Sequence, residues 1–120
     1  MDDGRPMFRQ IMDKIEGDIV SGTYYADEPV ISTTQIARVY SVNHATAVKA
    51  IGKLADSGIL YKRRGIGMYV AQGARETIAK KRRESFFDNT ISALLAEAKT
   101  LGISTEELIR TIKTKGEQSE

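Results

Sequence analysis

Residues 42–71, VNHATAVKAIGKLADSGILYKRRGIGMYVA, decide the fold because they begin like a helix and end like a hairpin. Asn43 has a side chain suited to an N-cap, and Gly58 is suited to end the helix that follows. Between them we expect a helix to about residue 57. Its apolar residues recur at helical spacing and predict a buried face of Ala47, Val48, Ile51, Leu54 and Ala55.

Two short β-prone runs follow this helix, at residues 59–62 (ILYK) and 68–71 (MYVA). The intervening RRGIG contains Gly65 and Gly67, which permit a tight reversal of the backbone. The pattern predicts a two-stranded hairpin. Just before its tip stand three consecutive cations, which repel one another unless an anion lies nearby; they are Lys62, Arg63 and Arg64.

Toward the N-terminus, residues 7–21 carry an apolar stripe at helical spacing and predict an amphipathic helix. Ser32 and Gln35 have the spacing of a capping box at the start of a short helix that reaches about residue 40. The order helix, short helix, helix, hairpin is that of a winged helix-turn-helix. In such a fold the third helix enters the DNA major groove with its N-terminal residues leading, and the hairpin lies beside it.

Toward the C-terminus we expect a long helix at residues 75–100 and a last helix at 105–113, followed by a disordered tail. The long helix carries a seam of apolar residues at heptad-like spacing. The fold class is therefore mainly α with a small β-hairpin. Two parts are predicted: a winged helix-turn-helix DNA-binding domain at 1–72 and a helical dimerisation region at 73–120.

The charge distribution points to a polyanionic partner. Residues 42–83 carry ten basic and two acidic side chains, a net charge of +8, whereas the segments on either side carry −3 each. A solvated lysine and arginine surface is the alternative. With no cysteine, one histidine and no long apolar run, we expect a cytoplasmic protein without a disulfide, metal site, cofactor or membrane segment.

The first 71 residues resemble the DNA-binding domain of GntR-family bacterial transcription regulators. The segments that carry the resemblance are IVSG, IS..QIA, VN..TAVKAI..L, GIL and RRGIGMYV. About 45 residues follow the hairpin. So short a C-terminal part is similar to that of the YtrA-type subfamily, in which the C-terminal helices chiefly form a homodimer. The resemblance implies a dimeric repressor, often of operons that encode ABC transporters.

Three departures from the family pattern affect the preferred base sequence. Val30 and Ile31 precede Ser32 where the family usually has Leu-Pro, and Thr34 occupies a position that commonly holds a DNA-contacting arginine. At the third helix, His44 and Ala45 replace the usual Pro-Asn. These positions are ones where side chains would meet base edges.

We predict DNA contacts from both helix starts and from the hairpin. The candidate residues are Thr33, Thr34, His44, Ala45, Thr46, Lys49, Lys62, Arg63, Arg64, Gly65 and Gly67. Thr33 and the pair Arg64–Gly65 match family contact positions. Structural alternatives remain open: Thr46 could complete a helix cap, Lys49 could be a solvated helix lysine, and both glycines could serve turn geometry alone.

The apolar seam is predicted to join two copies of the chain, because helix-turn-helix proteins pair on palindromic half-sites. The predicted dimer interface consists of the seam residues Phe86, Phe87, Ile91, Leu94, Leu95, Ala98 and Leu101, together with Leu108 and Ile112 of the last helix. Alternatively, the seam could pack on its own DNA-binding domain. The leading hypothesis is a homodimeric repressor that binds double-stranded DNA, and a winged-helix module for protein interaction is the second. No catalytic motif favours an enzyme, and the sequence identifies no effector.

Overall fold

The computed structural model describes residues 4–65 and 67–119. The chain divides into two compact units, Met1–Lys80 and Lys81–Glu120. The first contains α1 (Met7–Val20), α2 (Thr33–Val39), α3 (His44–Asp56), β1 (Leu60–Arg63), β2 (Gly67–Val70) and the start of α4 (Ala74–Ser85). The second contains the end of α4, the π-helical turn η1 (Phe86–Thr90), α5 (Ile91–Thr100) and α6 (Thr105–Ser119).

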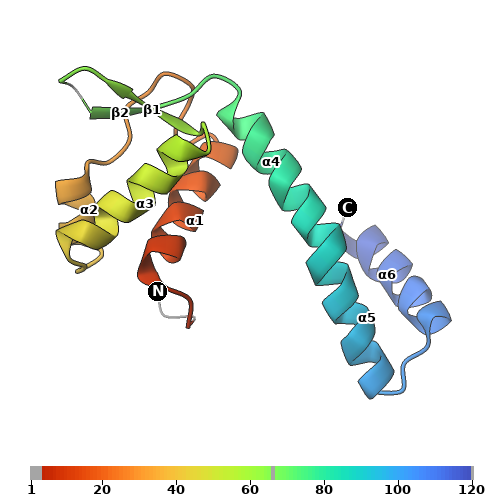
Figure 1. Ribbon diagram of the computed structural model, residues 1–120. Helices are drawn as coiled ribbons and strands as arrows, with labels where there is room; N and C mark the ends of the chain where they lie inside the picture. The colour runs from red at the N-terminus through yellow and green to blue at the C-terminus, as the bar shows by residue number, and fades with distance from the viewer. Residues whose placement is uncertain (1–3, 66, 120) are drawn as a thin grey trace. The chain divides into compact units, whose positions relative to one another are not determined.

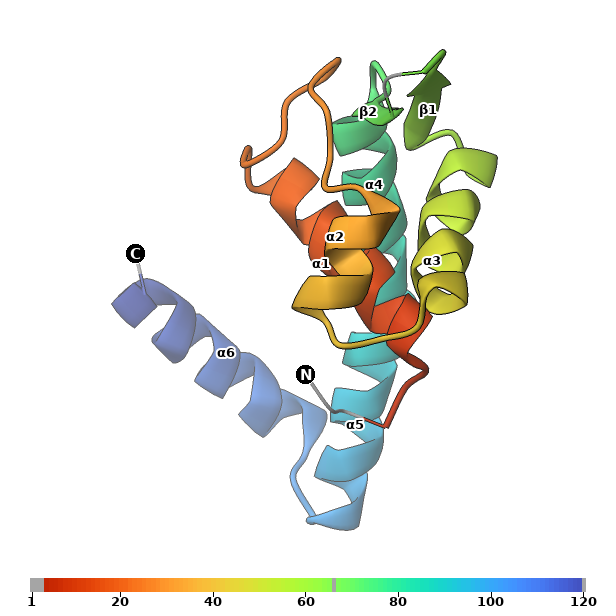
Figure 2. The same cartoon turned by 90° about the vertical axis from the view of Figure 1, so that its left-hand side faces the viewer.

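The core of the first unit is built on α1, which packs against α3, while α3 also packs against α2. Figures 1 and 2 show these three helices together below the hairpin. The stripe predicted along α1 is confirmed at Ile11, Ile15 and Ile19, each at most 2% exposed. Pro6 serves as the N-cap of α1, where its missing N–H costs nothing. The order of elements confirms the winged helix-turn-helix.

The buried face of α3 differs in part from the prediction. Ala47, Ile51 and Leu54 are buried, but Val48 is 47% exposed and Ala50 takes its place in the core. Helical spacing places Val48 at the edge of the predicted stripe. Because α1 and α2 cover α3 from one side only, the edge of that stripe stays in solvent. Val48 therefore belongs to the outer surface of α3.

The hairpin is an antiparallel pair in which Leu60 faces Val70 and Arg63 faces Gly67. The α1–α2 connector joins it as a third extended segment, because Val30 N donates to Met68 O and Val70 N donates to Glu28 O. Leu60 and Val70 are buried in the core, so the base of the hairpin is fixed on the helices.

The long helix predicted for residues 75–100 is confirmed as a run of α4, η1 and α5, which begins in the first unit and continues in the second. Gly102 ends it with a φ of 71°, and Ser104 caps α6 by accepting from Glu107 N at 3.1 Å. The tail differs from its predicted disorder, because α6 continues to Ser119. Lysine, glutamate and glutamine are good helix formers and outweigh the cost of Gly116. Among the described residues, no helix combines the length and the apolarity needed to cross a bilayer.

Candidate nucleic-acid interface

The starts of α2 and α3 are fixed by side-chain caps. Ser32 Oγ accepts from Gln35 N at 3.1 Å and Gln35 Oε1 accepts from Ser32 N at 3.1 Å, which is a complete capping box. Asn43 Oδ1 accepts both from Thr46 N and from Thr46 Oγ1, each at 2.9 Å. The two caps fix where α2 and α3 begin, and both capping residues are exposed. The backbone N–H groups and the dipole at a helix N-terminus favour an anion.

The candidate residues at these two starts lie at or near the surface. Thr34, His44 and Ala45 are exposed, while Thr33 and Thr46 are half-buried. The Thr46 hydroxyl donates to the Asn43 side chain, so its hydrogen is engaged and its lone pairs remain able to accept. The structure therefore gives Asn43 and Thr46 a capping role and leaves the outward side of the first turn to His44 and Ala45.

Lys49 is exposed and leans toward α1, where its Nζ lies 4.1 Å from the centroid of the Phe8 ring. Val48 is next to it on the outer surface of α3, which also contains His44, Ala45 and Lys53. Among the described residues of the first unit, no element covers this outer surface. An α-helix with such an uncovered side is what insertion into a major groove requires.

The three cations before the hairpin tip do not share one environment. Lys62 and Arg64 are exposed. Arg63 is also exposed, but its guanidinium carbon lies 4.3 Å from the Tyr69 ring centroid and its Nη2 donates to Tyr61 Oη at 3.3 Å. Residues 61, 63 and 69 share one face of the hairpin, and Lys62 points to the other. Arg63 therefore stabilises the hairpin, whereas Lys62 and Arg64 remain available.

Asp27 connects this hairpin face to the α1–α2 connector. Its carboxylate accepts from Tyr61 Oη at 2.7 Å and from Gln72 Nε2, and its backbone N donates to Val70 O at 2.7 Å. The Tyr61 hydrogen bond, followed by that of Gln72, lowers the pKa of Asp27 below its usual range. The same bond to Asp27 raises the pKa of Tyr61, because ionisation would remove the donated proton. No local pattern in the sequence indicates this network, which joins side chains 34 and 45 residues apart.

Both tip glycines have positive φ values, 74° at Gly65 and 117° at Gly67. Both are exposed, and a Cβ built on either would meet no atom within 4 Å. Their role is therefore conformational, and the space beside their backbone is open to a partner.

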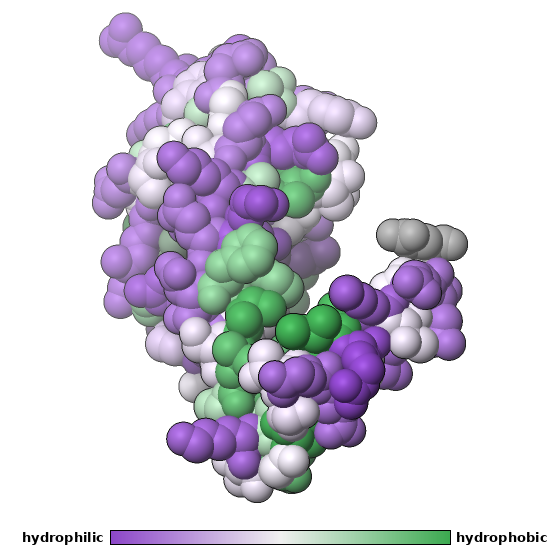
Figure 3. All heavy atoms as spheres, turned by 90° about the vertical axis from the view of Figure 1, so that its right-hand side faces the viewer, coloured by the Kyte–Doolittle hydropathy of each residue, from purple (hydrophilic) through white to green (hydrophobic). Residues whose placement is uncertain are grey.

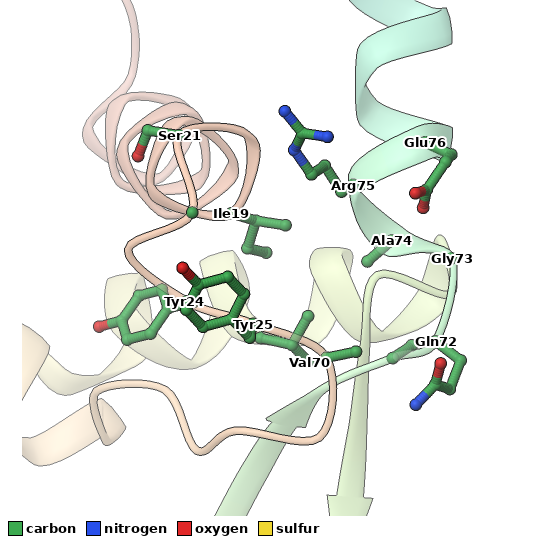
Figure 4. A pocket seen from close by; sticks show the side chains of 13 residues that line it. Ile19, Ser21, Tyr24, Tyr25, Val70, Gln72, Gly73, Ala74, Arg75 and Glu76 are labelled. Carbon is green, nitrogen blue, oxygen red and sulfur yellow. The ribbon is translucent and has the colours of Figure 1, made fainter.

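A cavity of about 520 Å³ lies in the first unit between the end of α1, the connector and the start of α4 (Figure 4). Tyr25 and Val70 line it, together with Arg75, whose Nε donates to Val20 O at 2.9 Å. Its volume lies within the range of small-molecule sites. Gln72 lines the cavity and also bonds Asp27, so the cavity wall is continuous with the residues that hold the hairpin.

The second unit exposes much of its predicted apolar seam, and Figure 3 shows apolar side chains gathered along it. Exposed fractions are 48% for Phe86, 55% for Phe87 and 64% for Leu101, and Leu94, Leu95 and Ile112 are also exposed. Ile91 and Leu108 are half-buried. Ala98 is only 6% exposed and is therefore packed inside its own chain, whereas Ile109 of the last helix is 47% exposed. So large an uncovered apolar surface is typical of an interaction site.

Comparison with known proteins identifies the family of the first unit. Residues 8–70, which are 63 of the 120, match the model for bacterial regulatory proteins of the gntR family. Two relatives come from Bacillus subtilis (strain 168). The transcriptional repressor NagR is 28% identical over 71 residues, covering 59% of this chain and 29% of NagR. The transcriptional repressor YtrA is 24% identical over 108 residues, covering 90% of this chain and 82% of YtrA.

Solved structures agree with these matches. A GntR family transcriptional regulator from Listeria monocytogenes has a TM-score of 0.78 and 31% identity, covering 95% of this chain and 98% of that one. AraR(DBD) in complex with operator ORR3 has a TM-score of 0.53 and 30% identity, covering 55% of this chain and 80% of that one. The likeness to the Listeria protein extends through the C-terminal helices, whereas the likeness to AraR covers about the length of the first unit.

Proposed function

Since this chain belongs to the GntR family of bacterial regulatory proteins, we propose that it represses transcription as a homodimer bound to a palindromic operator. The chain is a transcription regulator of GntR type with a winged-helix DNA-binding domain, and the family is not one of enzymes. Repression is supported by NagR and YtrA, which are both named repressors. A transporter operon as the target, and action in the cytoplasm, belong to the same proposal.

The observation that carries this proposal is an uncovered outer surface of α3 in the same unit as an exposed basic hairpin. His44 and Ala45 would approach base edges at the first turn of α3, while Lys62 and Arg64 would meet the backbone beside the groove. Thr33 and Thr34 would face a phosphate from the start of α2. Open backbone at Gly65 and Gly67 would let the hairpin come close to the duplex. The AraR domain, in complex with its operator, supports the use of this fold on duplex DNA.

We place the DNA-binding domain at residues 1–72 and the dimerisation region at 73–120. The apolar seam supports pairing of two copies, because Phe86, Phe87, Leu94 and Leu101 would otherwise stay in water. Burying one such side chain is worth about 1.5–3 kcal/mol, so several together can sustain a stable dimer. A twofold axis through this region would present two copies of α3 to successive half-sites.

Selection of bound duplexes from a random pool by the full chain tests DNA binding. We expect an enriched palindrome whose binding weakens steeply with salt, since each neutralised phosphate releases counterions. Failure to enrich any duplex, even at low salt, would reject DNA binding in favour of a protein-interaction module.

Sedimentation equilibrium tests the dimer separately. We expect the wild-type chain to sediment as a dimer and Leu101→Asp to sediment as a monomer. Thr100→Asp is the control, because Thr100 is exposed and directly precedes Leu101 at the end of α5. A wild-type monomer at all concentrations would reject the homodimer.

A further inference from the structure

Three cations from two helices converge on one aromatic ring. Lys49 Nζ and Lys53 Nζ lie 4.1 Å and 5.7 Å from the centroid of the Phe8 ring, and Arg9 Cζ lies 5.4 Å from it. Arg9 and Phe8 are on α1, and both lysines are on α3. We call Arg9, Lys49 and Lys53 the cation cluster. The face of an aromatic ring attracts cations, so Phe8 holds the cluster together against its own repulsion.

The cluster has no carboxylate partner within residues 4–65 and 67–119. Two ion pairs among the described residues near this end of the chain involve other groups: Arg5 pairs with Asp13, and Lys14 pairs with Asp18 at 3.1 Å. All three cluster residues are exposed, and Phe8 is half-buried. The cluster therefore displays its positive charge to solvent at the edge of α3. The acid one turn away from Arg9 on α1, Asp13, is paired with Arg5 and not with the cluster.

We infer that the cation cluster is a phosphate-binding site for the DNA backbone, with Phe8 as its positioning residue. This inference rests on the proposed function, which lays α3 in a major groove. Lys49 and Lys53 are four residues apart and so lie one turn apart along α3, at the edge of its outer surface that is nearest to Phe8. A backbone strand that borders the groove passes along that side of α3, where a phosphodiester meets the cluster.

Phe8 lowers the cost of binding by holding long side chains before the DNA arrives. A lysine side chain that moves freely in solvent loses rotamer freedom when it binds a phosphate. Contact with the Phe8 ring already restricts these side chains, so less rotamer freedom is lost on binding. The geometry also changes the expected role of Lys49. Its Nζ is drawn toward α1 and away from the middle of the outer surface of α3, which favours a phosphate over a guanine edge. Phosphate contacts fix position and carry no direct base information.

The test measures how the affinity for a duplex varies with salt. Two duplexes are used: one enriched by selection from a random pool and one of unrelated sequence. Lys53→Ala and Arg9→Ala should each flatten the slope of log K against log salt by about 0.9 for each phosphate that the variant no longer neutralises. Both should weaken binding to the two duplexes by the same factor, because a phosphate contact is independent of sequence. Lys14→Ala, whose cation is paired with Asp18, is the matched control and should change neither quantity.

The role of Phe8 is tested with variants that leave the number of charged residues unchanged. Phe8→Leu removes the ring and should weaken binding to both duplexes by about two- to fivefold at unchanged salt slope, while Phe8→Tyr, which keeps a ring, should restore it. Thermal unfolding of each variant establishes that the fold is kept.

Two outcomes overturn the inference. One is that Lys53→Ala and Arg9→Ala keep the wild-type slope and affinity. The other is that Lys49→Ala weakens binding to the selected duplex alone, which would make Lys49 a base contact. Absence of wild-type binding to any duplex would instead reject the proposed function itself, so the two failures are distinguishable.

Discussion

Replacement of Asn43 by alanine separates a capping role from a DNA-reading role at the start of α3. The Asn43 side chain accepts two hydrogen bonds from Thr46, one from the backbone N and one from the hydroxyl, both at 2.9 Å. Loss of an N-cap costs about 0.5–2 kcal/mol. Because the second bond is also removed and leaves the Thr46 hydroxyl to water, we expect a decrease of about 1–2 kcal/mol in the free energy of unfolding.

The assay is thermal and urea unfolding of the full chain followed by circular dichroism. For a unit of this size, each kcal/mol lowers Tm by about 4–8 °C. Asn43→Asp is the control, because aspartate accepts the same bonds and its charge suits a helix N-terminus. It should keep the wild-type Tm yet weaken DNA binding, since it adds a negative charge where phosphates approach. An unchanged Tm in Asn43→Ala would refute the capping argument.

Three further changes test the interface and its support. The exposed Val48 is expected to cover a thymine methyl, so Val48→Ala should weaken binding to a selected duplex about fourfold in a gel shift. Replacing that thymine with deoxyuridine should then have no added effect on binding by the variant. Gly67→Ala should destabilise the hairpin by about 1–3 kcal/mol, because Gly67 has a φ of 117°. Gly52→Ala should stabilise the protein by about 1 kcal/mol, because Gly52 lies inside α3 and no atom is within 4 Å of the new Cβ. Urea unfolding measures both changes. The folded pKa of Asp27 is below its ordinary value of 3.8, so its stabilising effect is present above that pH and is lost as pH falls through the folded value. Asp27→Asn should accordingly differ most from wild type at neutral pH and converge with it in acid, in unfolding experiments at pH 7 and pH 3.

Several local features of this fold could be predicted from short sequence patterns. Capping residues at Ser32 and Asn43 and the glycines at the hairpin tip follow from short-range rules, and the structure has each of them in the expected conformation. The spacing of apolar residues also indicated the seam on the long helix, although it included Ala98, which is packed inside its own chain. Periodicity identifies an apolar stripe, but it does not show how much of that stripe a neighbouring element covers.

The sequence by itself determined the elements of this protein, their order and their caps, because hydrogen bonds within a helix or a tight turn involve residues only a few positions apart. The tertiary structure alone decided which individual side chains are exposed and which groups they contact. Val48 is exposed because α1 and α2 leave that edge of α3 uncovered. Arg63 is held by Tyr61 and Tyr69, and Lys49 is drawn to Phe8, far earlier in the chain. These outcomes depend on which surfaces meet when helices and hairpin pack, and that packing brings together groups that no local pattern relates.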